Sequence, residues 1–182
     1  KIIGCIGSFD QFKNQKLIVD TIAKFNDLRN HIFIFIGDGS EKNDIQKLTN
    51  EHKLNHCIQF LGYKQEAYKY ISSFDLLITS SISEGGPPLI VLECFFYKTL
   101  VIASNILPHQ EIIREDKTGF LFQDGDSFSL YNSICKAIHT KNKKSILENA
   151  HIMYNERFNF DNTFSRYFET YRKLVATKFE LE

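Results

Sequence analysis

The fold class is indicated by the segment Asp75-Leu-Leu-Ile-Thr-Ser-Ser-Ile-Ser-Glu84-Gly-Gly-Pro-Pro88-Leu-Ile-Val-Leu-Glu93-Cys94. It contains an apolar strand, a loop of small residues and a helix in direct succession. The two glycines and two prolines of the loop are typical of residues that end a strand and start a helix. We expect the strand at Leu76–Ser80 and the helix at Pro88–Tyr97, with Pro88 at the first helical position. Strand, loop and helix in this order form the unit from which parallel α/β sheets are built.

The same alternation runs through most of the chain. Short apolar runs predict further strands at Ile2–Gly7, Ile32–Gly37, Ile58–Gly62, Leu100–Ala103 and Gly119–Phe122. Helical patterns separate them, with Ser40 expected as one N-cap and Asp126 or Ser127 as another. The sequence therefore predicts an α/β fold with a doubly wound, Rossmann-like, parallel six-stranded sheet followed by C-terminal helices.

The last predicted helix carries an aromatic stripe. Its apolar residues recur at spacings of three and four, with Asp161 as the cap candidate: Phe160, Phe164, Phe168, Tyr171 and Leu174. We expect this stripe to be buried, on this domain or partly on a missing one, because an exposed stripe promotes aggregation.

Composition argues against several classes of function. Lys+Arg and Asp+Glu both number 22 in the 182 residues, so no global field attracts nucleic acid. The apolar runs are far shorter than the ~20 residues of a membrane span. The four cysteines include no CxxC pair, which favours buried thiols over disulfides or zinc. His52, His56 and Cys57 lie close together but lack a fourth ligand, so we expect no metal.

The loop after the Leu76–Ser80 strand has the chemistry of a nucleotide-sugar site. Because proline has no N–H group, the amides available to an anion are those of Gly85, Gly86, Leu89 and Ile90. Glu84 and Glu93 bracket these amides, and carboxylates accept hydrogen bonds from sugar hydroxyls. The alternative is a plain Gly-Pro turn with two solvated glutamates. The apolar surroundings of Glu93 favour a binding site over a plain turn, because a buried carboxylate without a hydrogen-bond partner is costly.

Residues 81–93 resemble the paired-glutamate motif of the retaining GT-B glycosyltransferases of the family called GT4. Further landmarks follow in the family's order: Gly7-Ser8-Phe9 with Lys13-Asn14, Gly37-Asp-Gly39, Phe60-Leu-Gly62, Val101–Ser104, Glu111-Ile-Ile, Thr118-Gly119, Gly125-Asp126 and Arg157-Phe158. The resemblance covers nearly the whole chain. It implies that residues 1–180 form the nucleotide-sugar-binding, C-terminal lobe of a two-lobed enzyme whose N-terminal acceptor domain is absent here. The final Leu181 and Glu182 are interpreted as a cloning scar.

The resemblance also implies a role for each matched residue. Glu84, the candidate catalytic residue, would contact hydroxyls of the donor sugar, and Glu93 would bind the ribose. Lys13 would neutralise the diphosphate, and the base would lie against Phe60–Tyr63. The other donor-binding candidates are Gly7, Ser8, Gly85, Gly86, Leu89, Ile90 and Glu111.

A family member of this kind transfers a hexose from UDP- or GDP-hexose, without a metal cofactor, to a glycan or lipid-linked acceptor held by the other lobe. We expect an enzyme of bacterial surface polysaccharide or lipopolysaccharide synthesis, cytoplasmic or peripheral to the membrane. The isolated lobe should bind the donor without turnover.

Three positions depart from the family's pattern. Eight residues instead of seven separate Glu84 from Glu93. Ser8 stands where an arginine is common, so a second diphosphate cation would come from Lys16, Lys64 or elsewhere, or would be missing at the expense of affinity. Ile106-Leu-Pro-His109 replaces a glycine pair, and we expect His109 to be a surface residue of a loop rather than a donor contact.

Three other hypotheses compete with the glycosyltransferase: a GT-B sugar-nucleotide epimerase, a non-catalytic flavodoxin-like ligand-binding module, and a degenerate transferase domain. A phosphorelay receiver is disfavoured, since the ends of the first and third strands carry Gly7-Ser8-Phe9 and Phe60-Leu-Gly62 instead of clustered acids and a phosphoacceptor aspartate.

Overall fold

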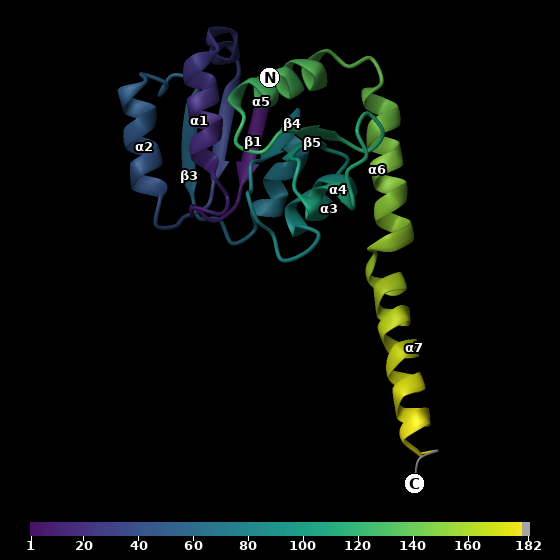
Figure 1. Cartoon of the computed structure of the whole chain (residues 1–182). Helices are drawn as coiled ribbons and strands as arrows, with labels where there is room; N and C mark the ends of the chain where they lie inside the picture. The colour runs from purple at the N-terminus through teal and green to yellow at the C-terminus, as the bar shows by residue number, and fades with distance from the viewer. Residues whose placement is uncertain (180–182) are drawn as a thin grey trace.

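A computed structural model describes the backbone of residues 1–179 and side chains as far as Val175, so that the expected scar at Leu181 and Glu182 lies outside the described residues. Six parallel strands form one sheet in the order β3-β2-β1-β4-β5-β6 (Figure 1). Their bounds are β1 Ile2–Ile6, β2 Ile32–Ile36, β3 Ile58–Gly62, β4 Leu76–Thr79, β5 Leu100–Ser104 and β6 Phe120–Phe122. Every predicted strand is therefore confirmed, with ends within one residue of the expected ones.

Helices cover both faces of the sheet, as a doubly wound fold requires. One face carries α1 Gln15–Lys24, α2 Lys42–Glu51 and α5 Ser127–His139, and the other carries the 3-10 helix η2 Ala67–Ser73, α3 Leu89–Phe96 and α6 Lys143–Arg157. A 3-10 helix, η1 Asn26–Asn30, follows α1, and the short α4 Leu107–Gln110 follows β5. The last helix, α7 Phe160–Phe179, extends away from this body (Figure 1).

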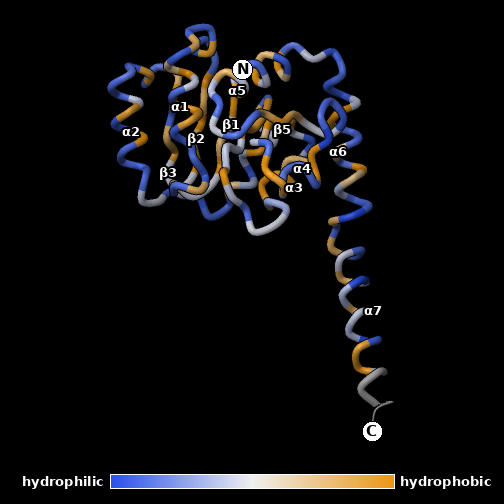
Figure 2. The backbone as a smooth tube through the Cα atoms, in the orientation of Figure 1, coloured by the Kyte–Doolittle hydropathy of each residue, from blue (hydrophilic) through white to orange (hydrophobic). Residues whose placement is uncertain are grey.

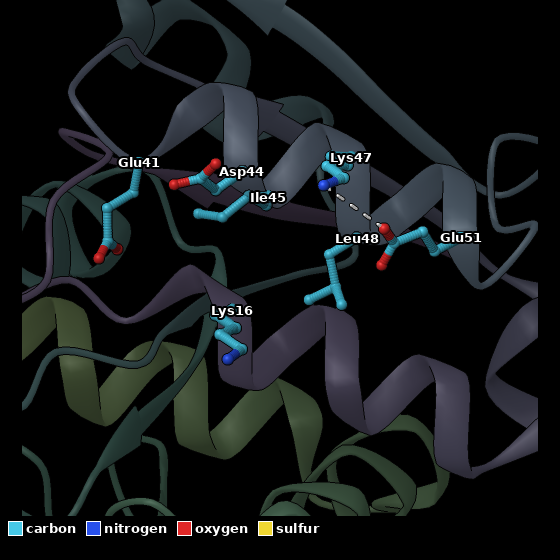
Figure 3. A pocket seen from close by; sticks show the side chains of 7 residues that line it. All are labelled: Lys16, Glu41, Asp44, Ile45, Lys47, Leu48 and Glu51. Atoms are coloured by element: carbon cyan, nitrogen blue, oxygen red, sulfur yellow. Dashed lines mark ion pairs between the residues drawn. The ribbon is translucent and has the colours of Figure 1, made fainter.

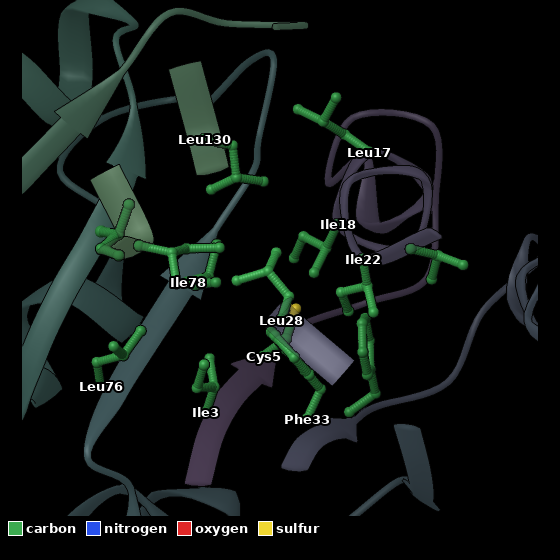
Figure 4. Close-up of a cluster of buried hydrophobic side chains, with 14 of the residues drawn as sticks. Ile3, Cys5, Leu17, Ile18, Ile22, Leu28, Phe33, Leu76, Ile78 and Leu130 are labelled. Carbon is green, nitrogen blue, oxygen red and sulfur yellow. The ribbon is translucent and has the colours of Figure 1, made fainter. Parts of the chain in front are cut away.

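The core consists of two hydrophobic clusters, one on each side of the sheet. Side chains of a strand alternate between its faces, and accordingly Leu76 and Ile78 point into the cluster under α1 and α5 whereas Leu77 joins the cluster under α3 and α6. Figure 4 shows part of the first cluster, in which Ile18 and Ile22 of α1 meet the strands. Because both faces are covered, each strand reads as a continuous apolar run, which is why the strands could be found from the sequence.

The start of α5 agrees with the predicted cap, whereas the starts of α2, α3 and α7 differ from the predictions. Asp126 caps α5 as expected, since its Oδ1 accepts from the N–H groups of Phe128 (2.8 Å) and Ser129 (3.2 Å). Ser40 does not cap α2, which Glu41 precedes without a side-chain cap. Pro88 is not the first helical residue but the extended residue before α3, with ψ 130°.

The N-terminus of α7 is capped by Asn159 rather than by the predicted Asp161. Asn159 Oδ1 accepts from Asn162 N at 2.8 Å, while Asp161 lies within the first turn. In both α7 and α2, several polar residues surround the start of the helix, and composition alone does not select among them.

The aromatic stripe of α7 lies exposed, which corrects the expectation that it packs on this domain. Exposure is 79% for Phe160, 58% for Phe164, 54% for Phe168, 65% for Tyr171 and 61% for Leu174. Figure 2 shows hydrophobic residues concentrated in the sheet of the body, whereas along α7 they recur on a helix with no neighbouring element. Within the described part of the chain, no helix is long and apolar enough to cross a membrane.

Candidate functional site

The strand order creates a crevice between β1 and β4. These neighbouring strands lead into helices on opposite faces of the sheet, α1 and α3, so the loops that follow them diverge. In open parallel sheets such a switch point, at the carboxyl ends of the strands, is where ligands bind. The two loops with the predicted site residues, 7–14 and 80–88, both lie here.

The loop after β1 is held in shape by one carboxylate. Asp10 Oδ2 accepts from the Ser8 hydroxyl at 2.6 Å, and its Oδ1 accepts from the N–H groups of Phe12 (2.9 Å) and Lys13 (3.1 Å). The hydrogen bond from Ser8 is the main reason that the pKa of Asp10 is lowered. Ser8 therefore shapes the turn that presents Lys13, while its own side chain bonds to a neighbour in the loop.

The two loops are joined by an ion pair. Lys13 Nζ lies 2.5 Å from Glu84 Oε1, and their side chains are only 27% and 13% exposed. Ser80 Oγ lies 2.9 Å from the carbonyl oxygens of Lys13 and Asn14, and Ile82 N donates to Phe12 O at 2.8 Å. The fold thus brings together a cation and a carboxylate that are 71 residues apart in the sequence.

The start of α3 leaves backbone amides available beside this pair. Val91 and Leu92 donate to Pro88 O, whereas within the described residues the N–H groups of Leu89 and Ile90 have no backbone or side-chain acceptor. Gly85 and Gly86 stand clear of neighbouring atoms, with nothing within 4 Å of where a Cβ would lie. An anion could approach these amides closely, and the helix dipole would favour it.

Glu93 lies one turn further along α3, half-buried as its apolar neighbours predicted. Burial raises its pKa above the ordinary value of 4.5. No described side chain forms a salt bridge with it, so its carboxylate is free to accept hydrogen bonds from a ligand.

A cavity of about 310 Å³ opens beside the crevice, at the ends of β1, β2 and β3. Its lining residues are Ile6, Gly7, Ser8, Ile36, Gly37, Asp38, Tyr63, Lys64 and Ala67. Gly37 is required here, because a Cβ would come within 1.9 Å of Gly7 O. Of the segment Phe60–Tyr63, Tyr63 lines the cavity whereas Phe60 packs in the core against Phe35, with ring centroids 5.3 Å apart.

The sequence singled out two residues of the later loops, Glu111 and His109. Among the described residues Glu111 forms no bond with the Lys13–Glu84 ion pair, and His109 differs from the prediction. Glu111 is exposed at the end of α4, and among the described residues its carboxylate has no hydrogen bond or ion pair. His109 is not a surface residue: its exposure is 0%, which corrects the prediction. Its burial depends on contacts with Ser104 across a turn, which sequence spacing does not reveal.

A second hollow, of about 300 Å³, lies between α1 and α2, away from the crevice (Figure 3). Charged side chains dominate its rim, including Lys16, Asp44 and the Lys47–Glu51 ion pair at 3.9 Å. It contains none of the predicted donor-binding residues. Lys16 therefore faces this hollow, while Lys64 lines the cavity that also contains Ser8.

The sequence as a whole is similar to a known protein family, to curated relatives and to solved structures. Residues 1–153 match the family of glycosyl transferases group 1. The chain belongs to this family. The match favours transfer over the epimerase and regulatory-module readings of the sequence.

Relatives and solved structures agree with the assignment. The chain is 26% identical over 173 residues to the O-antigen biosynthesis glycosyltransferase WclY of Escherichia coli, covering 95% of this chain and 47% of that protein. It is similar in fold to Anabaena HepE, solved in complex with UDP, with a TM-score of 0.87 at 21% identity, covering 94% of this chain and 48% of that one. The C-terminal domain of LpcC from Francisella tularensis gives a TM-score of 0.75 at 20% identity, covering 87% and 86%. The chain thus spans about half the length of WclY and HepE and most of the isolated LpcC domain.

Proposed function

We propose that this chain is the nucleotide-sugar-binding lobe of a retaining glycosyltransferase that transfers a hexose to a glycan or glycolipid acceptor. The observation that carries the proposal is the Lys13–Glu84 pair at the switch point of the sheet, in which Glu84 belongs to the loop that resembles the family's paired-glutamate motif. A cation, free helix amides and two carboxylates together match the diphosphate and the hydroxyls of a nucleotide sugar.

In this proposal each group has a separate task. Lys13 and the amides of Leu89 and Ile90 stabilise the charge that develops on the departing nucleoside diphosphate, so the leaving group needs no metal ion. Glu84 accepts hydrogen bonds from the donor sugar, and Glu93 accepts them from the ribose. Gly7, Ser8 and Tyr63 border the cavity in which we expect the nucleoside.

The relatives support a proposal for the donor and the pathway. WclY is named for O-antigen biosynthesis, and HepE was solved with UDP, which supports a UDP-hexose donor and a surface-polysaccharide or lipopolysaccharide product. The acceptor would bind a second lobe, corresponding to the half of the relatives that this chain does not span. We therefore propose a cytoplasmic enzyme, in contact with the membrane through its lipid-linked acceptor, and no turnover by this lobe alone.

The test is calorimetric titration of the chain with UDP, GDP and ADP, and with their hexose conjugates, in the absence of added metal. We expect one base to bind saturably and Glu93→Gln to weaken that binding roughly ten- to a hundredfold. Glu51→Gln, at the far end of α2, is the matched control and should have no effect. Failure of all nucleotides to bind at millimolar concentration would contradict the proposal and favour a degenerate domain.

A further inference from the structure

The imidazole of His109 is buried although its turn lies at the surface. His109 belongs to α4, whose Leu107 is 68% exposed, yet His109 itself is 0% exposed. Its Nδ1 lies 2.8 Å from Ser104 O and 3.1 Å from Ser104 Oγ. The ring is thereby fixed against the carboxyl end of β5.

The hydrogen-bond partners determine which nitrogen carries the proton. Ser104 O is a carbonyl and can only accept, and the single hydroxyl hydrogen of Ser104 is donated to Ser81 O. Both atoms facing Nδ1 are thus acceptors, so Nδ1 must carry a hydrogen. In the neutral ring Nε2 is then a bare acceptor.

Nε2 has no hydrogen-bond partner among the residues that the structure describes, although it is fully buried. The charges of Glu84, Lys13 and Asp124 act on the ring, and its partner Ser104 donates to Ser81 O in the loop that leads to Glu84. Burial lowers the pKa of His109, so the ring is neutral at neutral pH. A buried acceptor without a donor is costly, and a ligand O–H group would remove that cost.

We propose that His109 is a further specificity-determining residue of this site, whose Nε2 accepts a hydrogen bond from a hydroxyl of the donor's hexose. The inference rests on the proposed function. In the proposed complex the diphosphate engages Lys13 and the sugar engages Glu84, the two side chains whose charges act on the ring. A phosphate oxygen would not suit this position, because it has no hydrogen to donate to a neutral Nε2.

The test compares binding of UDP with binding of UDP-glucose, UDP-galactose and UDP-N-acetylglucosamine. In His109→Asn, the amide N–H can replace Nδ1–H toward Ser104 O, but the acceptor at Nε2 is lost. We expect UDP to bind as in the wild type and the preferred UDP-hexose to bind about tenfold more weakly. His109→Gln retains an acceptor near the Nε2 position and should restore part of the preference for the sugar.

His151→Asn is the matched control, because the Nδ1 of His151 also bonds a backbone carbonyl, Phe95 O at 3.2 Å, but on α6. Long-range proton–nitrogen NMR of the wild type gives a second readout that does not require a folded variant. The Nε2 resonance of His109 should shift with the UDP-hexose and not with UDP.

An unchanged sugar preference in His109→Asn, or an Nε2 resonance that ignores every UDP-hexose, would overturn this inference while UDP binding still supported the proposed function. Failure of the wild type to bind any nucleotide would overturn both.

Discussion

Helices α1 and α7 carry similar apolar spacing in the sequence but have opposite surroundings in the fold. In α1, Leu17, Ile18 and Ile22 are 7%, 1% and 0% exposed, whereas Phe160 and Phe164 of α7 are 79% and 58% exposed. Periodicity predicts which face of a helix is apolar; it does not predict what covers that face. The body of the domain is therefore stabilised by its own buried core. Helix α7 adds an apolar surface that the described residues leave exposed.

The sharpest test of this contrast is a pair of phenylalanine truncations. Phe35 is 0% exposed in β2, so Phe35→Ala should lower the free energy of unfolding by about 3–5 kcal/mol. Phe164→Ala on α7 removes the same atoms from an exposed site and should change it by less than about 0.5 kcal/mol. Urea unfolding followed by circular dichroism measures both. Equal losses would mean that α7 is part of the cooperative core.

The crevice lies within the body, so its residues should act on ligands independently of α7. Lys13→Ala should weaken UDP binding by about 1.5–3 kcal/mol and uridine binding much less, because uridine lacks the diphosphate. Lys16→Ala, three residues along and facing the hollow beside α2, is the control. Calorimetry measures the binding free energy of both ligands. Equal losses of binding free energy for UDP and uridine would place Lys13 away from the phosphates.

Burial of the Glu93 carboxylate in the crevice should lower the free energy of unfolding at neutral pH. Its pKa is raised by burial, so the folded state holds the proton more tightly than the unfolded state does. That contribution to stability is present at low pH and is lost as the pH rises through the raised pKa. Glu93→Gln should therefore increase the free energy of unfolding at pH 7, with a smaller gain near pH 4. A destabilised variant at pH 7 would contradict this account.

Removal of the whole of α7 should have only a small effect on stability. Its described hydrogen bonds to the body come from Asn162, whose side chain donates to Asn155 O at 2.8 Å and Glu156 O at 3.3 Å. A chain ending at Phe158 should unfold within about 1 kcal/mol of the longer one. It should also self-associate less in sedimentation experiments, because the exposed aromatic stripe is gone. A collapse of the truncated fold would show that the contrast between body and helix is false.

The sheet could be predicted from the sequence because its strands are buried on both faces and lie between clear helical patterns. The loop with Glu84 and Glu93 also stood out, since carboxylates beside two glycines and an apolar helix are chemically unusual. The burial of His109 was missed because it depends on the turn that brings its ring to Ser104, and Ser104 is in turn held by its bond to Ser81 O after β4. Pro88 was misplaced by one position, a difference set by local backbone angles and not by composition.

The projecting α7 has a consequence for the hydrodynamics of the molecule. Twenty helical residues rise about 30 Å, roughly the diameter of a small domain. A 21.2 kDa particle with such an arm is elongated, and it should diffuse and sediment more slowly than a sphere of equal mass. Small-angle X-ray scattering of the monomer would register the arm as a tail in the distribution of interatomic distances.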